Sequence, residues 1–480
     1  MRKRVLPLAS IVLAVLLFSA VTSSAPRVVQ AQASSTKPNF VFILADDMRN
    51  DDLNPKYMPK TTALLRNQGM RFDAAFVSYG LCCPSRATIL RGQYAHNTGV
   101  WSNGNGGDPV GGWQGYKNNG NEQDNLATRL QAAGYSTGLF GKYFNYYDGS
   151  AEPPGWNDWF ATFRTGTSQA SYFDYDVNDN GNIKHYGTRA SDYNTDVIGR
   201  QTQDFINASV AGGKPFFAYV SAKAPHAIAT PAPRDVNTFN GIKAPRLPSF
   251  NENNVSDKPP WIQALPNLST TETARIDKRH EDRVESLQAV DDLVEGVVNK
   301  LRDNGQLSNT YIVFTSDNGW HHGEHRLQKG KAYPYEEDIH MPLLVRGPGV
   351  QAGSSTDKLI LNTDYFPTFT DLGGVQTPDY VDGRSLRPVL KGRVSSWRSA
   401  VLLEQRKTTE SDTGFYGIRT SDSKYVEYQG GFRELYNLTT DPYELNNAYE
   451  ASAPPDGLAT RLQALKSCTG ASCRAAEDGP

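Results

Sequence analysis

Two of the four cysteines in this chain, Cys82 and Cys83, are adjacent and immediately precede the residues "PSR". Neighbouring cysteines do not readily bond to each other, because disulfide geometry conflicts with the trans peptide between them. We therefore expect the pair to serve packing or chemistry rather than cross-linking. The other two, Cys468 and Cys473, lie close together near the C-terminus and could close a small loop.

Acidic and amide residues follow two apolar segments of similar design. "NFVFILA" precedes Asp46 and Asp47, and "TYIVFTS" precedes Asp317 and Asn318. If both segments are strands of one open α/β sheet, these side chains lie in the crevice at its carboxyl edge. Oxygen ligands from separate segments suit Ca²⁺ or Mg²⁺ better than zinc. Each pair alone could simply cap the next turn, but together they favour a metal site.

The surrounding pattern indicates the elements that would position these residues. Short apolar runs alternate with amphipathic segments, which is typical of β-α units around a largely parallel sheet. "PFFAYVSAKAPH" is another expected strand with a polar end, and residues 277–305 form a long amphipathic helix. Residues 102–121, rich in Gly and Asn, are expected to form a surface loop. From about residue 385 the pattern favours a smaller antiparallel sheet, so we predict a catalytic domain over 34–385 and a C-terminal subdomain over 386–480.

Residues 1–33 are typical of an export signal, with a basic start, an apolar core and "AQA" as a cleavage site. No second apolar run is long enough to span a bilayer, so we expect no stable membrane insertion after cleavage. The remaining chain has 45 basic and 51 acidic side chains, a net charge of −6. This balance argues against a general nucleic-acid binder, although a local basic pocket for an anionic substrate remains open.

The segment "LCCPSRATILRGQY" (81–94) resembles the C-x-P-S-R signature of the formylglycine-dependent (type I) sulfatases. "ADD", "GK" (141–142), "APH" (224–226), "SDNG" (316–319) and "GKAYPYEE" (330–337) follow in the order of that family. The resemblance covers roughly residues 38 to 390. It is strongest to the branch of N-acetylglucosamine-6-sulfatases and extracellular glucosamine-6-sulfatases. It implies an alkaline-phosphatase-like α/β fold, with a large, mostly parallel sheet flanked by helices and a smaller C-terminal antiparallel sheet.

The resemblance also implies an answer for the cysteine pair. A formylglycine-generating maturation enzyme would oxidise Cys82 to formylglycine (3-oxoalanine), and Cys83 would remain a thiol. One hydroxyl of the hydrated aldehyde would attack sulfur, and the second would expel sulfate as the carbonyl re-forms.

The matching motifs imply roles for further residues. Arg86 would hold the formylglycine and the metal carboxylates, Lys142 and Lys331 would bind sulfate, and His226 would protonate the leaving oxygen. His321 stands where several relatives carry an active-site histidine. The implied metal ligands, for Ca²⁺ with Mg²⁺ as the alternative, are Asp46, Asp47, Cys82, Asp317 and Asn318. Relatives often carry a histidine where this chain has Phe144 and Asn145, so the residue that accepts the proton during sulfate elimination stays open.

Two other motifs contain potential metal ligands but lack the full spacing of a known metal site. "HHGEH" (321–325) lacks the H-E-x-x-H spacing of a helical zinc site, and we expect a substrate-facing loop there instead. "DVNDNGNIKHYG" (176–187) begins like an EF-hand loop but ends in Gly187 rather than a bidentate glutamate. We expect a hairpin turning at Asn180 and Gly181.

These observations predict an exported sulfuric ester hydrolase acting on 6-O-sulfates of N-acetylglucosamine-type sugars in glycosaminoglycans. Its location would be the periplasm or the extracellular space, or the lysosome in a eukaryote. The alternatives are an arylsulfatase of broad specificity and a phosphonate or phosphodiester hydrolase of the same superfamily. A catalytically silent glycan-binding relative is a further alternative.

Overall fold

β1 (Asn39–Ala45) lies near the middle of a large mixed sheet. The computed structural model describes Met1 and residues 37–104, 109–167, 169–394, 396–407, 414–449 and 457–479, so the expected export signal lies outside the described residues. In this part of the chain, ten strands pair in the order β11-β2-β10-β9-β1-β8-β4-β5-β6-β7. The five central strands, β9 to β5 in this order, run parallel, and antiparallel pairs flank them.

The other strands of this sheet are β2 (Met70–Phe72), β4 (Ser136–Gly141), β5 (Asp158–Phe163), β6 (Tyr175–Asp179), β7 (Asn182–Tyr186), β8 (Phe216–Ser221), β9 (Thr310–Ser316), β10 (Leu343–Arg346) and β11 (Ser354–Thr356). β3 (Ala75–Phe76) and β12 (Ile360–Leu361) form a short parallel pair. β6 and β7 are the expected hairpin, with Asn180 and Gly181 at positive φ in its turn. That prediction is confirmed.

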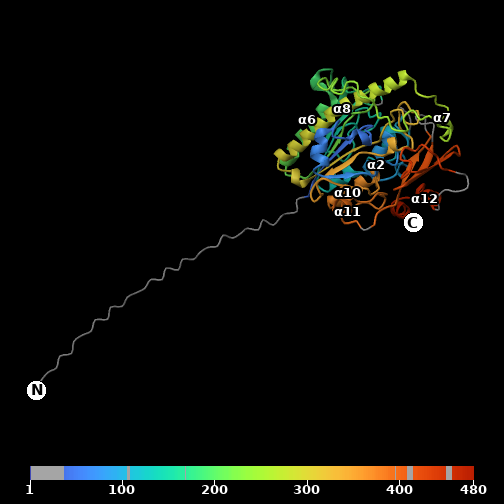
Figure 1. The fold of residues 1–480 in the computed structure, drawn as a ribbon. Coiled ribbons are helices and arrows are strands. Elements are labelled where there is room, and N and C mark those ends of the chain that lie inside the picture. Colours follow the sequence, from blue (N-terminus) through green and yellow to red (C-terminus); the bar gives the residue numbers. More distant parts are fainter. Residues whose placement is uncertain are drawn as a thin grey trace. The chain divides into compact units, whose positions relative to one another are not determined.

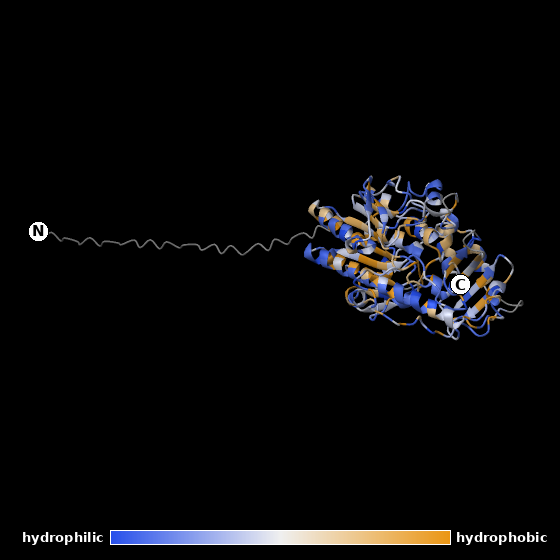
Figure 2. Cartoon of the chain, turned by 90° about the horizontal axis from the view of Figure 1, so that it is seen from above, coloured by the Kyte–Doolittle hydropathy of each residue, from blue (hydrophilic) through white to orange (hydrophobic). Residues whose placement is uncertain are grey.

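Helices cover both faces of the large sheet, which explains why its central strands are continuously apolar. Val41 and Ile43 of β1 contribute to a buried core with α6 (Asn194–Ala211) and α8 (Thr270–Asp303). Phe42 and Leu44, on the opposite face, pack into a core with α2 (Cys82–Arg91) and α10 (Tyr365–Leu372). Figure 1 shows α6 and α8 along one side and α10 and α11 on the other. In Figure 2 the hydrophobic colour concentrates on the inner strands.

The remaining helices are α1 (Pro59–Thr61), α3 (Ala95–Thr98), α4 (Gly112–Asn118), α5 (Leu126–Ala132), α7 (Pro260–Gln263), α9 (Glu336–Ile339), α11 (Arg387–Leu390), α12 (Leu458–Leu465) and α13 (Ala471–Asp478). Short helical turns occupy η1 (Asn50–Asp52), η2 (Thr62–Arg66), η3 (Ala190–Asp192), η4 (Leu307–Asn309) and η5 (Asn362–Asp364). α4 lies inside the segment expected to be a loop, so that expectation was wrong for residues 112–118. Trp113 and Tyr116 anchor this helix by burial in the core.

A second sheet, antiparallel throughout, follows in the C-terminal part. Its four described strands are β13 (Ala400–Gln405), β14 (Phe415–Thr420), β15 (Ser423–Tyr428) and β16 (Arg433–Asn437), paired in chain order. α12 and α13 pack with this sheet in one hydrophobic cluster, and Cys468 is bonded to Cys473 within it. The expected architecture of a large, mostly parallel sheet and a smaller antiparallel one is confirmed.

None of the helices in the described ranges combines the length and the apolar character that crossing a bilayer requires.

Candidate active site

The carboxyl ends of four neighbouring parallel strands bring the site together. Cα pairing aligns Gly141 of β4 with Ser221 of β8, and Ser221 with Leu44 of β1. It also aligns Ala45 of β1 with Ser316 of β9. The residues that follow each strand therefore meet at one edge. They are Lys142, Asp46, Asp47, Asp317 and Asn318, and all five are buried.

Asp47 is held in an uncommon backbone conformation at this edge. Its φ is 67°, in the left-handed region that residues other than glycine seldom adopt. Its backbone N–H donates to Asp317 Oδ1 at 3.1 Å, and Arg283 donates to its carbonyl oxygen. Asn318 Nδ2 donates to Asp47 Oδ1 at 2.7 Å. Residues 46–47 and 317–318 are therefore joined directly by hydrogen bonds.

The two adjacent cysteines lie in different environments. Cys82 opens α2, and its Sγ is 3.3 Å from Asp46 Oδ1 and 2.7 Å from Lys331 Nζ. Burial and the nearby Asp46 carboxylate raise the pKa of its thiol well above the usual range. Cys83 belongs instead to the hydrophobic core, where its Sγ accepts from the Asn145 backbone N–H at 3.2 Å. The structure thus places Cys82, and not Cys83, among the polar residues.

Three cations neutralise the buried acids. Arg86 donates from Nε to Asp317 Oδ2 at 2.8 Å, and Lys142 Nζ donates to Asp46 Oδ2 at 2.6 Å. Lys331 pairs with Asp47 as well as contacting Cys82. Although burial opposes it, Lys142 above all holds the pKa of Asp46 well below its usual range. Burial and the Asp46 charge raise the pKa of Asp317 to about 6.

The arrangement of oxygens fits a divalent cation. One ligand atom each from Asp46, Asp47, Cys82 and His226 lies within 4.8 Å of the others. Asp47 Oδ2 and Asn318 Oδ1 are buried and have no hydrogen-bond partner within the described part of the chain. Burying such acceptors without a partner is costly. A Ca²⁺ or Mg²⁺ ion would satisfy them, since both ions prefer carboxylate and amide oxygens.

His226 follows β8 and lies at the edge of this group. Its Nε2 is 3.6 Å from Asp47 Oδ2, and Gln169 Nε2 is 3.0 Å from the same ring nitrogen. Burial lowers the pKa of His226 to about 3, against the opposing effect of the Asp47 charge. The ring is therefore neutral at pH 7, and an anionic group brought next to it would favour protonation.

His321 lies apart from the acidic group. Its ring nitrogens are 3.4 Å from Asp338 and 3.7 Å from Glu324, and despite burial the Asp338 charge raises its pKa to about 10. Within the described residues, its ring has no hydrogen bond or ion pair with the residues at the strand ends. Its backbone N–H donates to the carbonyl of Gly330, next to Lys331, at 2.9 Å. A catalytic role for His321 stays a prediction.

The role of "HHGEH" as a substrate-facing loop stays a prediction. His321, His322, Glu324 and His325 are all fully buried. Glu324 accepts from Arg49 Nη1 at 2.9 Å, and His325 Nδ1 lies 2.7 Å from Glu252 Oε2. The two carboxylates are therefore engaged, whereas both ring nitrogens of His322 are buried without a hydrogen-bond partner among the described residues.

Two basic residues of the site were missed by the motif analysis. Arg283 of α8 is fully buried and donates to the carbonyls of Pro225 and Asp47. Its sequence signal was a polar residue within the apolar stripe of an amphipathic helix, between Ile276 and Leu287. Lys223 precedes His226 by three residues, and burial lowers its pKa to about 8. A lysine at the polar end of an apolar strand was the available signal.

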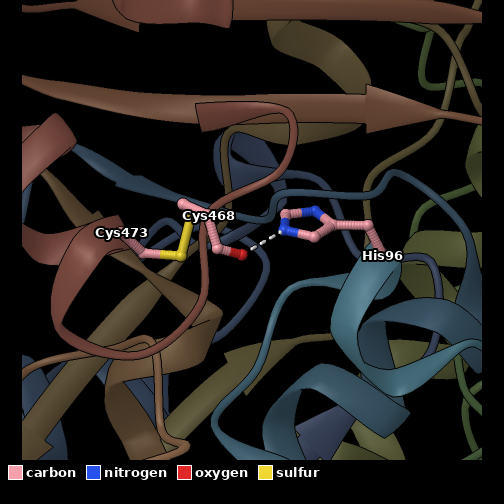
Figure 3. A group of neighbouring side chains, drawn as sticks. All are labelled: His96, Cys468 and Cys473. Atoms are coloured by element: carbon pink, nitrogen blue, oxygen red, sulfur yellow. Dashed lines mark hydrogen bonds between the residues drawn. A yellow bond between two sulfur atoms is a disulfide. The ribbon is translucent and has the colours of Figure 1, made fainter. Parts of the chain in front are cut away.

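Two further groups of potential metal ligands are already engaged within the protein. His96, Cys468 and Cys473 lie together, but the two sulfurs form a disulfide and His96 Nε2 lies 2.9 Å from the Cys468 carbonyl oxygen (Figure 3). Glu281, Asp282 and Glu285 lie on α8, where Lys278 pairs with the first two.

Comparison with known proteins identifies the family. Residues 38–375 match the family model described as "Sulfatase". The chain belongs to the sulfatase family. Residues 323–466 also match the model described as "N-sulphoglucosamine sulphohydrolase, C-terminal". This sulfatase therefore carries both the signature region and the C-terminal region as recognised family segments.

Several curated sulfatases are similar to this one. The N-acetylglucosamine-6-sulfatase of Capra hircus is 34% identical over 491 residues, 92% of this chain and 86% of that protein. The Homo sapiens protein of the same name is 34% identical over 489 residues. The extracellular sulfatase SULF-1 homolog of Drosophila melanogaster is 38% identical over 395 residues, 79% of this chain. The chain spans 34% of the length of that last relative.

Solved structures show the same architecture. A protein solved in complex with its substrate D-glucosamine-2-N,6-O-disulfate superposes with a TM-score of 0.72 and 26% identity, covering 87% of this chain and 94% of that one. The phosphonate monoester hydrolase of Silicibacter pomeroyi gives a TM-score of 0.66 at 22% identity, covering 88% and 93%. The second likeness concerns the fold alone.

Proposed function

We propose that this sulfatase is exported and hydrolyses the 6-O-sulfate of N-acetylglucosamine-type sugars in glycosaminoglycans. The observation that carries the proposal is the position of Cys82 in its C-x-P-S-R motif, between Asp46 and Lys331 at the carboxyl edge of the sheet. The names of the N-acetylglucosamine-6-sulfatases support the sugar, as does the glucosamine disulfate bound by the similar solved structure. The export signal at residues 1–33 and the extracellular relative support the location.

In this proposal Cys82 is converted to formylglycine by a maturation enzyme, and a divalent ion occupies the acidic group. Formylglycine supplies the oxygen nucleophile that an unmodified thiol lacks. The ion, Ca²⁺ or Mg²⁺, supplies positive charge toward which sulfate oxygens are drawn. Its ligands would be residue 82 together with Asp46, Asp47, Asp317 and Asn318.

Other side chains would bind the sulfate, position the acidic residues and donate a proton. Lys142 and Lys331 place two ammonium groups beside Asp46 and Asp47, where they would bind oxygens of the sulfate. Arg86 fixes Asp317, and Arg283 fixes the backbone of Asp47. His226 would give a proton to the bridging oxygen as the sugar alcohol leaves.

Mass spectrometry of the peptide that contains residues 82 and 83 tests this proposal directly. We expect an aldehyde at residue 82 and a thiol at residue 83. Unmodified Cys82 in fully active protein would contradict the proposal. An N-terminus at residue 34 in the exported protein would support the signal assignment.

A phosphonate or phosphodiester hydrolase is the competing enzyme, because sulfate and phosphate esters require similar cationic sites. The ratio of hydrolysis rates on an aryl sulfate and an aryl phosphate diester separates the two. We expect the sulfate ester to be preferred. Preference for the diester would overturn the proposal.

A further inference from the structure

A basic pocket opens directly beside the site. It encloses about 490 Å³, within the range of roughly 300–1,000 Å³ typical of small-ligand sites. Ala227 and Gly330 belong to its lining. They are covalently bonded to His226 and Lys331, so each lies one Cα–Cα step, about 3.8 Å, from a residue of the site. The pocket therefore adjoins the part of the site where, under the proposed function, the leaving sugar would lie.

The charge of the lining is strongly positive. Arg275, Lys278, Arg279 and Lys329 line the pocket together with a single acid, Asp282. Asp282 is already paired with Lys278 at 2.8 Å. The protein as a whole has a formal net charge of −2, so the positive charge belongs to this pocket and not to the surface in general.

Three of these cations are not bonded to an acidic side chain, and one of the three, Arg279, donates to the Gln328 carbonyl oxygen at 2.6 Å. Arg275 and Lys329 are exposed, and neither makes a hydrogen bond or ion pair within the described ranges of the chain. Glu272, one turn before Arg275, is engaged by the Ser269 backbone and by Gln328. Arg275 and Lys329 are therefore available to an anionic ligand.

Apolar groups complete the pocket. Trp320 and Ile228 both form part of the lining, and Ile228 is 88% exposed. Aromatic and aliphatic walls with a few charged groups are typical of sites for small ligands. A saccharide unit that carries an acidic group matches this combination, since its ring offers C–H surface and its substituent offers charge.

One helix connects the pocket with the site. Arg275, Arg279 and Asp282 are spaced four and three residues apart on α8, so they share one face of the helix. Arg283 follows directly, binds the carbonyls of Asp47 and Pro225, and lies with its guanidinium 5.2 Å from the Trp320 ring. The pocket and the acidic group are thus fixed on the same rigid element.

We infer that this pocket binds a second anionic group, a sulfate or carboxylate, on the saccharide unit next to the one whose ester is hydrolysed. The inference rests on the proposed function and names its substrate class more narrowly. Multiply charged oligosaccharides, rather than isolated sulfated monosaccharides, are the preferred substrates.

The test compares two substrates that carry the same 6-sulfated glucosamine. One is the monosaccharide N-acetylglucosamine 6-sulfate, and the other is a heparan-type tetrasaccharide whose non-reducing end is the same N-acetylglucosamine 6-sulfate, followed by a uronic acid. In the Arg275→Gln/Lys329→Gln variant, we expect the ratio of kcat/KM for the tetrasaccharide to that for the monosaccharide to fall about tenfold, through KM. Added salt should reduce the wild-type ratio toward that of the variant, because exposed charges are screened.

A matched control removes two positive charges elsewhere. Lys184→Gln/Arg189→Gln changes two exposed cations near the β6–β7 hairpin and should leave the ratio unchanged. If the ratio of the two kcat/KM values were the same in wild type and the pocket variant, the inference would be overturned. A fall of the same size in the control variant would also overturn it.

Calorimetric binding of the tetrasaccharide separates this inference from the proposed function. We expect about tenfold weaker binding to the pocket variant than to wild type, whether or not the ester is cleaved. If wild type hydrolyses no sulfate ester, the proposed function fails while this binding difference still decides the pocket. Equal affinities would overturn the inference even in an active sulfatase.

Discussion

The two cysteine pairs of this chain are both buried, yet their surroundings differ completely. Cys82 and Cys83 open α2 with free thiols that face different environments, one among charges and one in the hydrophobic core. Cys468 and Cys473 are five positions apart, bonded to each other and packed with the C-terminal sheet. Figure 3 shows their disulfide, with the ring of His96 beside the Cys468 carbonyl.

Burial alone therefore does not mark a reactive cysteine. What sets Cys82 apart is a group of charges from three other parts of the chain, namely Asp46, Lys142 and Lys331. These charges alter the chemistry of the sulfur and could hold a sulfate beside it. Substitutions in both pairs and in the acidic group test this contrast.

The largest effect is expected from Cys82→Ala. Under the proposed function residue 82 becomes the nucleophile, so its removal should lower sulfatase turnover by more than about 10⁴-fold, as in other enzymes that lose a nucleophile. Cys83→Ala is the matched control one residue away, and it should keep substantial activity. Thermal unfolding of both variants reports whether the fold is intact. Equal loss of activity in both would show that the two sulfurs do not differ as the structure indicates.

Asp317→Ala should remove the metal and nearly all activity. The residue links Arg86 to the backbone of Asp47, and the acidic group needs most of its carboxylates to hold a divalent ion. Elemental analysis measures the metal directly. Because the change leaves Arg86 buried without its partner, Asp317→Asn should be measured beside it as a variant of similar volume. Full metal occupancy in both variants would count against the site.

The positions of the four acidic and amide residues of the site could be predicted, because the ends of the strands before them could be predicted. Asp46, Asp47, Asp317 and Asn318 follow apolar runs, and parallel strands bring such ends to one edge. Cys82 was assigned through its motif, and the structure separates its environment from that of Cys83.

Site residues that do not follow a strand of the large sheet could not be predicted from strand ends. Arg283 reaches the site from the middle of α8, where its place in the apolar stripe indicates burial but not which groups it contacts. His321 also lies 3.4 Å from Asp338, seventeen residues further along the chain, a contact that the short motif "HHGEH" does not encode. The sequence alone therefore did not show that the side chains of this motif are buried.

His226→Ala should have an effect that depends on the substrate. A sugar alcohol is a poorer leaving group than a phenol, so it needs a proton donor more. Hydrolysis of glucosamine 6-sulfate should fall by about 10²–10⁴-fold, and hydrolysis of nitrocatechol sulfate should fall far less. Measurement of kcat/KM for both enzymes on both substrates decides this.

Two outcomes of that experiment would require a different assignment. Equal losses on the two substrates would show that His226 is not the acid, and Lys223 would become the candidate, since burial brings its pKa to about 8. A wild-type enzyme that ignores amino-sugar sulfates yet cleaves aryl sulfates well would be an arylsulfatase.

The smallest effect on activity is expected from removal of the disulfide between Cys468 and Cys473. Cys468→Ala/Cys473→Ala opens a loop that links residues five positions apart. In the chain-entropy description, a loop this short contributes about 2 kcal/mol to the free energy of unfolding. Urea unfolding should show that loss, while kcat/KM on sulfate esters should stay within about twofold, because no residue of the acidic group contacts this disulfide among the described residues. A loss of activity comparable to that of Cys82→Ala, at full stability, would mean that the C-terminal pair acts on the site and that the contrast between the pairs is wrong.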